Sequence, residues 1–298
     1  LAPERGAYGS FAEAFAAAER FWESFWTSGA AIDTAGSTDP RAAELERRVV
    51  LSQYLTRVHG GGLTPPQETG FVTNSWNGKF HLEMHWWHSA HFPLWGRPEL
   101  LERQLRWYES IHERARGTAQ RQGYAGARWP KQIGPDGRES PSDIGALLIW
   151  QQPHLMSYAE LLYAAYAGDA DRQAALVERL APLIEDTAAF MADYADDVDG
   201  VFHLGPPVIP AQEFYTAAET TDPTFELAYW WYGLEVAQVW RGRLGQSRDE
   251  GWQRVQDNLA IPLQREGRYA AVANETETLP DDHPSMLMAY GFVPPTPV

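Results

Sequence analysis

Cysteine is absent from the 298 residues, and lysine occurs only twice, at positions 79 and 131. The absence of cysteine excludes disulfide bonds and thiolate metal sites, and it leaves the redox compartment undetermined. No apolar run approaches the roughly 20 residues that a membrane-spanning helix needs. The chain begins Leu-Ala-Pro, with neither a methionine nor a signal peptide, so we expect a processed product or a piece of a longer protein.

Acidic residues outnumber basic ones by 40 to 24, which gives a formal net charge of −16. This charge argues against nucleic acids and anionic membranes as partners. Hydrophobic residues make up 44% of the chain, enough to bury a sizeable core, and tryptophan, tyrosine and phenylalanine number 13, 13 and 12. Most aromatic residues serve core packing, but an excess also offers flat apolar surfaces to a ligand. We expect a single domain over residues 1–298.

Helical periodicity dominates the hydrophobic pattern. It predicts helices near residues 10–28, 40–59, 76–94, 98–121, 145–167, 170–195, 223–244 and 248–259, a ninth starting near 284, and short strands around 201–204 and 207–209. Pro153 should kink the fifth helix or limit its first turns. The long connections 61–75, 123–144 and 198–222 alternate with short ones. Short loops make antiparallel hairpins, and hairpins in series stack into a solenoid or close into a toroid. The long loops would then share one face.

The third long loop holds two candidate acids. Pro206, Pro207 and Pro210 prevent a helix and stiffen the backbone. Glu213 and Glu219 follow them, just ahead of the helix predicted from residue 223. A stiff polar loop above a helix start is suited to positioning an acid, although a solvated surface loop would have the same composition.

The first long loop and the helix after it offer groups that suit a sugar. Trp76 presents a flat apolar face, and Asn77, Lys79 and Glu83 add amide or charged hydrogen-bonding groups. Sugars have apolar ring faces and a rim of hydroxyls, so this mixture favours carbohydrate binding.

Three histidines in the same region raise the question of a metal site. His81, His85 and His88 lie at i, i+4 and i+7 on one helical face, which is a possible zinc pattern. The metalloprotease motif requires a glutamate directly after the first histidine, and Leu82 stands there. We therefore favour core histidines and predict neither a metal nor another cofactor.

The second long loop combines aromatic, proline and charged residues with glycine, which is untypical of a flexible linker. It carries Trp129 and Lys131, and the next predicted helix brings Gln151, Gln152 and His154 into an apolar run. Buried polar groups need partners. Either a polyhydroxylated ligand or the backbone of the long loops could supply them, and both remain open.

Taken in order, these segments resemble the catalytic domain of the clan-L glycoside hydrolases and phosphorylases, which are six-hairpin (α/α)6 toroids. The chain is most similar to family sixty-five, which includes maltose, kojibiose and trehalose phosphorylases and a disaccharide-type glucosidase. The resemblance runs from about residue 40 to the end. Lys131 stands where the family has a glutamate. The matching segments are 81–95, 126–130, 154–163, 205–213 and 222–229.

The resemblance implies inverting cleavage of an α-glycosidic bond in an oligosaccharide or glycoside. The glutamate of the matching loop is the family's general acid, so Glu213 would protonate the leaving oxygen, while a base from elsewhere would activate water on the opposite face. Trp76 and Trp129 would be sugar platforms, with Lys131 and His154 also at the substrate. The residues expected to bind sugar hydroxyls are Asn77, Lys79, Glu83, Gln151, Gln152 and Glu219.

The chain departs from the family in its extent. The family toroid has twelve helices, whereas about four hairpins and the start of a fifth are visible here, without the β-sandwich that usually precedes the toroid. We therefore expect an incomplete toroid with an exposed apolar edge beside residues 224–292, or a second protein chain that covers it. One alternative is a carbohydrate-binding or inactive remnant. A weaker one is a polysaccharide lyase, but the net charge counts against a uronate substrate.

Overall fold

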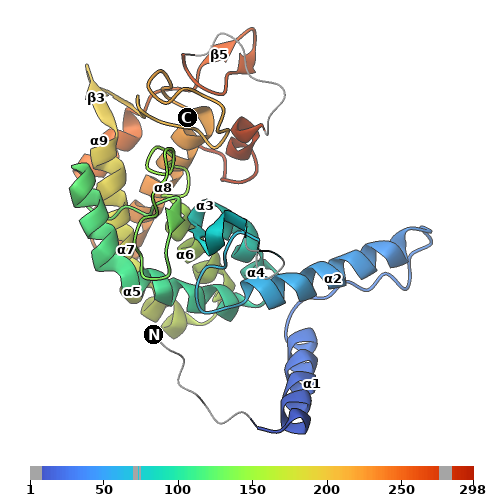
Figure 1. Cartoon of the computed structure of the whole chain (residues 1–298). Coiled ribbons are helices and arrows are strands. Elements are labelled where there is room, and N and C mark those ends of the chain that lie inside the picture. The colour runs from blue at the N-terminus through green and yellow to red at the C-terminus, as the bar shows by residue number, and fades with distance from the viewer. Residues whose placement is uncertain (1–8, 70–72, 74, 275–283) are drawn as a thin grey trace.

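The structure is a computed structural model that describes residues 9–69, 73, 75–274 and 284–298, and helices dominate it (Figure 1). The α-helices are α1 (Phe11–Thr27), α2 (Ala42–Gly60), α3 (Leu82–Ser89), α4 (His91–Leu94), α5 (Pro98–Gln122), α6 (His154–Ala165), α7 (Ala170–Tyr194), α8 (Thr224–Arg243) and α9 (Glu250–Asp257), and the 3-10 turns are η1 (Ser75–Gly78) and η2 (Ser285–Ala289). Three antiparallel ribbons pair β1 (Phe80–His81) with β2 (Gln132–Ile133), β3 (Asp196–Val198) with β4 (Val201–His203), and β5 (Gln264–Arg265) with β6 (Arg268–Tyr269).

The helices that follow one another in sequence also pack on one another, α5 on α6, α6 on α7, α7 on α8 and α8 on α9. Residues 154–159 of α6 and 224–230 of α8 are buried without interruption, so the first turns of these helices are enclosed on all sides. In contrast, α5 and α7 each keep one polar face in solvent. Inner helices thus alternate with outer ones, as expected for stacked hairpins, and the fold class is an all-α helical-hairpin toroid.

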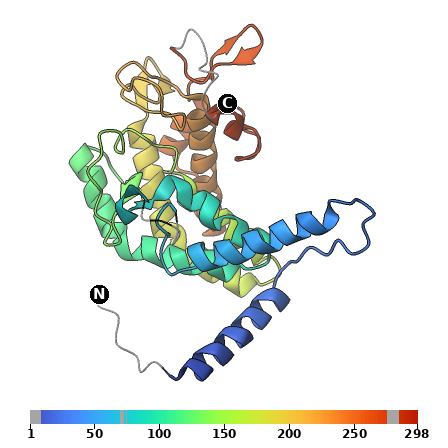
Figure 2. The same cartoon turned by 45° about the vertical axis from the view of Figure 1, so that its right-hand side comes forward.

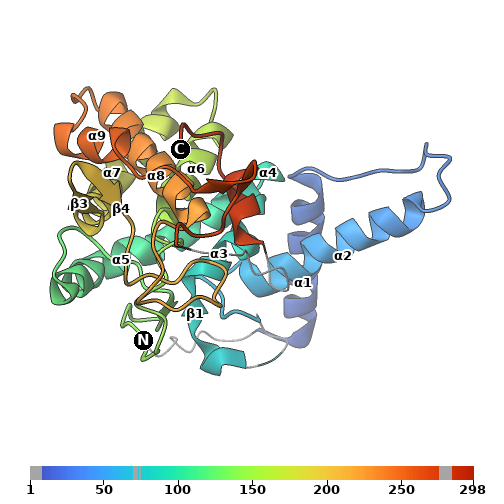
Figure 3. The same cartoon turned by 90° about the horizontal axis from the view of Figure 1, so that it is seen from above.

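The first two helices project from this body as an arm (Figures 1, 2 and 3). They meet at Trp22 and Tyr54, whose ring centroids are 4.9 Å apart. Buried Arg97 ties them to the body, because its guanidinium donates to the Phe25 carbonyl at 2.9 Å and to Gln53 Oε1 at 3.1 Å. The arm carries much of the exposed apolar surface, namely Phe11, Phe15, Phe21, Leu45, Val50, Leu51, Tyr54, Leu55 and Val58. Within 224–292, exposed apolar residues are fewer and include Val239, Ile261, Leu287 and Tyr290.

Two predicted helices start later than expected. The helix predicted over 76–94 is replaced by η1, β1, α3 and α4, because residues 80–81 pair with 132–133 in a ribbon. The helix predicted from 145 begins only at His154, directly after Pro153. Before it, the chain turns, and the Ile209 N–H donates to the Leu147 carbonyl. Residues 207–209 contribute a single bridge, between Leu148 and Ile209, and the predicted strand around 201–204 is present as β4.

None of the described helices has the length and apolar character needed to cross a membrane.

Candidate functional site

Charged side chains from all three long loops meet beside the start of α3. The Lys131 ammonium contacts Oε1 of Glu213 and lies 3.2 Å from Oε1 of Glu83. Nδ1 of His81 lies 3.1 Å from Glu68 Oε2 and 3.7 Å from Glu83 Oε1. We call these five residues the ionic cluster. They confirm that segments far apart in the sequence converge on one place, as the alternation of short and long connections predicts.

A short ribbon positions the middle of the cluster. His81 pairs with Gln132, and the Leu82 N–H donates to the Lys131 carbonyl at 2.8 Å. Lys131 is therefore held beside the first turn of α3, which contains Glu83. The positive end of a helix dipole favours a carboxylate in that turn.

The cluster is buried on one side and open on the other. The side chains of His81, Lys131 and Glu83 are 3%, 6% and 7% exposed, whereas those of Glu68 and Glu213 are 23% and 32% exposed. Glu68 and Glu213 are thus the two carboxyl groups that a ligand can reach.

The surroundings of the cluster raise the pKa of both Lys131 and Glu68. Burial lowers the pKa of Lys131, but the Glu83 and Glu213 carboxylates together outweigh it, so the pKa is raised. Burial is also the main cause that raises the pKa of Glu68, and the charges of Glu83 and Glu213 add to it against the opposing effect of His81 and Lys131. The environment of Glu68 therefore favours a bound proton more than water does.

The sequence interpretation missed Glu68, although a signal for it exists. Pro65-Pro66-Gln67-Glu68 and Pro210-Ala211-Gln212-Glu213 share the pattern Pro-X-Gln-Glu. Both glutamates follow a proline by three residues in a long loop, and both reach the same cluster. The argument from proline stiffness that singled out Glu213 applies equally to Glu68.

Trp129 is not a sugar platform, which corrects the sequence-based prediction. Its side chain is only 1% exposed and lies in the main core. Its indole N–H donates to Thr187 Oγ1 at 2.9 Å, and its ring packs edge-on against Tyr108. No face of the ring remains open to a ligand.

Gln151, Gln152 and His154 are buried as well, so the prediction that they contact a ligand directly is also corrected. The side-chain oxygen of Gln152 accepts from the backbone N–H of Trp129 at 2.9 Å, and its side-chain nitrogen donates to the Ala127 carbonyl at 2.6 Å. Gln151 donates to the carbonyl of Trp129 at 3.1 Å. His154 contacts the Tyr229 hydroxyl and the Glu83 carbonyl through its two ring nitrogens. Of the two alternatives, these side chains satisfy the loop backbone and hold the segment that carries Lys131.

Three other predicted residues, Asn77, Lys79 and Glu219, take no part in the contacts described above. Asn77 and Glu219 are exposed, and Lys79 is half-buried. Asn77 has a left-handed backbone with φ of 58°. The side chain of Trp76 lies outside the part of the chain that the structure describes. Their roles at a sugar therefore stay predictions.

The three histidines of the possible zinc pattern have separate partners. His85 lies 2.7 Å from Gln104 Oε1 and 3.0 Å from the Tyr108 hydroxyl, and burial lowers its pKa to about 3. His88 contacts the Glu68 carbonyl at 2.9 Å. Among the described residues, no group of three or more histidines and carboxylates is arranged to hold a metal ion.

Glu226, in the first turn of α8, supports the loop that carries Glu213. It is 1% exposed, and its Oε1 accepts from the Ala211 N–H at 2.6 Å. Burial raises its pKa from 4.5 to about 7, against the lowering effect of that hydrogen bond. Glu226 therefore joins the loop to the helix while holding a proton over much of the acidic range.

This pKa predicts a pH-dependent stability. Below pH 4.5 Glu226 is protonated in both the folded and unfolded states, and between 4.5 and about 7 only the unfolded chain releases the proton. The stability present below pH 4.5 is thus lost as the pH rises toward 7.

We expect Glu226→Gln to remove this loss, so that the stability of the variant relative to the wild type increases by on the order of 3 kcal/mol between pH 4.5 and 7.5. Urea unfolding at several pH values measures it, with exposed Glu219→Gln as control. A constant difference between variant and wild type would contradict the assignment.

Comparison with known proteins supports the fold. No protein-family model matches the chain, and no curated protein sequence matches it. In contrast, 13 chains of solved structures match. One is described as "Putative kojibiose phosphorylase from human microbiome", with a TM-score of 0.64 and 15% sequence identity. The match covers 87% of this chain but only 39% of the other, so the present chain spans less than half of that protein. At this identity the likeness shows a common fold.

Proposed function

We propose that the chain processes glycosides and that the ionic cluster is its reaction centre. The observation that carries the proposal is the contact of two carboxyl groups, Glu83 and Glu213, with one buried lysine. A third carboxyl group, Glu68, joins them through His81, which lies near both Glu68 and Glu83. Glycoside cleavage uses two carboxyl groups that flank the bond, one as acid and one as base or nucleophile. The toroid fold, shared with a protein described as a kojibiose phosphorylase, supports an oligosaccharide as the substrate.

Within this proposal, Glu213 is the general acid of an inverting cleavage, as the resemblance to family sixty-five implies. Its carboxyl group contacts the Lys131 ammonium, and this contact must be broken before Glu213 can protonate a leaving oxygen. Substrate binding must therefore turn the ammonium away from Glu213. Glu83 is the available acceptor, because its carboxylate already lies 3.2 Å from the same ammonium. Glu68, the other accessible carboxyl group, is the second candidate for proton transfer.

The same ion pair favours one alternative, a carbohydrate-binding protein without turnover. If the contact between Lys131 and Glu213 persists when a sugar is bound, the cluster offers only hydrogen bonds to hydroxyls. We also propose, for either function, that a second protein chain covers exposed apolar surface of the toroid.

Product analysis tests the proposal. The purified chain is incubated with α-linked glucose disaccharides and an aryl α-glucoside, with and without inorganic phosphate, and the first-formed anomer is followed by proton NMR. Release of the β-anomer without phosphate indicates inverting hydrolysis, and phosphate-dependent release of a β-glycosyl phosphate indicates phosphorolysis. Retention of configuration would contradict the inverting mechanism. Binding without turnover would establish the carbohydrate-binding alternative.

A further inference from the structure

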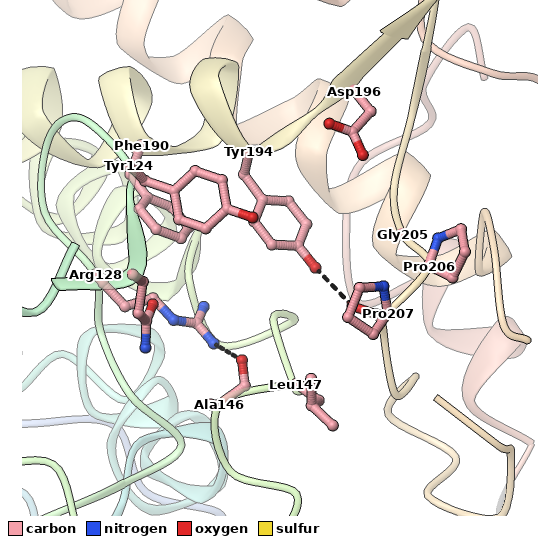
Figure 4. A pocket seen from close by; sticks show the side chains of 11 residues that line it. Tyr124, Arg128, Ala146, Leu147, Phe190, Tyr194, Asp196, Gly205, Pro206 and Pro207 are labelled. Atoms are coloured by element: carbon pink, nitrogen blue, oxygen red, sulfur yellow. Dashed lines mark hydrogen bonds between the residues drawn. The ribbon is translucent and has the colours of Figure 1, made fainter. Parts of the chain in front are cut away.

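A cavity with mostly apolar walls lies between the carboxyl ends of α5 and α7 (Figure 4). Its volume is about 180 Å³, and its walls include Tyr124, Arg128, Phe190, Tyr194 and Pro207. Among the described residues that line it, none belongs to the ionic cluster. Arg128 and Lys131 lie in the same loop. Trp129, which stands between them in the sequence, has its side chain buried in the core. The cavity is therefore a separate place on the molecule.

Arg128 brings a buried positive charge to this cavity. It is 1% exposed, and its guanidinium donates to the carbonyls of Ala146 and Leu148 at 3.2 and 2.5 Å and to Gln152 Oε1 at 3.4 Å. All three acceptors are neutral, and the carboxylate of Glu139 acts on Arg128 only through space. A buried cation without a contacting anion is costly, so an anion placed beside it would be strongly favoured.

The rest of the cavity suits a small ring. The rings of Tyr124 and Tyr194 lie 5.3 Å apart, and the Tyr194 hydroxyl donates to the Pro207 carbonyl at 3.4 Å. A cavity of roughly 150 Å³ accommodates benzene, so about 180 Å³ is enough for one six-membered ring. The volume, and the aromatic walls, therefore fit a single ring and not an extended chain.

The far side of the cavity carries a negative charge. Asp196, on β3, is exposed, and Figure 4 shows its carboxylate on the side opposite Arg128, beyond Tyr194. This carboxylate repels a second negative charge on a ligand and accepts hydrogen bonds from donor groups. The Arg128 end of the cavity therefore favours an anionic group, and the Asp196 end favours hydrogen-bond donors.

We propose that this cavity binds a small ring-bearing monocarboxylate, with its carboxylate on Arg128 and its hydrogen-bond donors toward Asp196. Nη2 of Arg128 already donates to the Ala146 and Leu148 carbonyls, so the carboxylate would take one charge-assisted hydrogen bond from the remaining N–H groups. The donors can be the hydroxyls of a sugar acid or the ammonium of an amino acid, and both share the chemistry that the cavity recognises.

Calorimetric titration of the whole chain tests this with two matched pairs, D-glucuronate against D-glucose and L-phenylalanine against L-phenylalanine amide. We expect at least one acid to bind tenfold or more tightly than its neutral partner. Failure of both acids to do so would overturn the proposal. The Asp196→Asn variant separates the two sources. It should reduce the affinity for an amino acid, because it removes the negative partner of the ammonium, and it should leave the affinity for a sugar acid unchanged.

Two variants locate the binding. Arg128→Gln should reduce the affinity of the preferred acid at least tenfold, but Arg128 also holds loop carbonyls and the variant can misfold. Ala146→Leu avoids this problem, because Ala146 is exposed and contributes only its backbone carbonyl to Arg128. It should fill the cavity and reduce affinity equally, while Ala175→Leu on the exposed face of α7 leaves affinity unchanged. Wild-type affinity in a folded Ala146→Leu protein would show that the acid binds elsewhere and overturn the proposal.

Discussion

Glu213→Gln is expected to lower kcat on a natural disaccharide by about 10²- to 10⁴-fold, the usual contribution of a general acid. The amide has the shape of the carboxyl group but cannot donate its proton to the leaving oxygen. An aryl glycoside with a good leaving group needs less protonation, so its turnover should fall much less. Measuring kcat for both substrates separates loss of the acid from general damage to the site.

The control for this variant is Glu178→Gln. Glu178 is an exposed glutamate of α7 that belongs neither to the ionic cluster nor to the predicted sugar-binding residues. If Glu213→Gln keeps the wild-type rate on the disaccharide, the acid is another residue. Glu68 is then the next to substitute, because burial raises its pKa and it shares the open side of the cluster.

Lys131→Met should destabilise the fold by about 3–5 kcal/mol, the range for breaking a buried ion pair from one side. Methionine fills the space of the lysine stem but leaves Glu83, 7% exposed, without the cation that lies 3.2 Å away. Chemical denaturation measures the loss. Lys79→Met, which removes the half-buried lysine, is the matched control and should cost less than about 1 kcal/mol.

The double variant Lys131→Met/Glu83→Gln decides whether the cost arises from the stranded charge. Removing the carboxylate as well should recover most of the lost stability, since replacing both partners of a buried pair is often neutral. A double variant no more stable than Lys131→Met alone would mean that packing or the Glu213 contact, and not the unpaired charge on Glu83, sets the cost.

Much of the helical framework could be predicted because its signals are local. The ends of α5, α7 and α8 fall within one residue of the predicted 98–121, 170–195 and 223–244. Local chemistry marks these ends: Asp169 accepts from the Arg172 N–H at the start of α7, and Gly123 adopts φ of 89° after α5. Apolar periodicity indicates the span of each helix, Asp169 marks the start of α7, and Gly123 marks the end of α5.

The late start of α6 and the break before α3 could not be predicted in the same way. The apolar run Leu147-Leu148-Ile149-Trp150 fits a helix, but in the structure its backbone meets a distant loop through Leu147 and Ile209. Similarly, Phe80 and His81 pair with a segment more than fifty residues away. Long-range backbone pairing of this kind leaves no local signal. Pro153, predicted to kink the helix or limit its first turns, instead directly precedes its first residue.

The candidate site was predicted only in part, for a chemical reason. Residue type and loop position were enough to bring Glu83, Lys131 and Glu213 together as candidates. The glutamines and His154 have the same hydrogen-bonding groups whether they face a sugar or a carbonyl, so sequence alone could not decide between the two. Their burial decides it, and the same is true of Trp129.

The scarcity of lysine has a practical consequence for labelling the protein. Lys131 is buried, and its raised pKa keeps its amine protonated, so acylating reagents should react with it slowly. Lys79, the only other lysine, lies two residues before His81 of the ionic cluster. An amine-reactive fluorophore would therefore attach to one lysine side chain beside the site, and its emission could report ligand binding without any engineered cysteine.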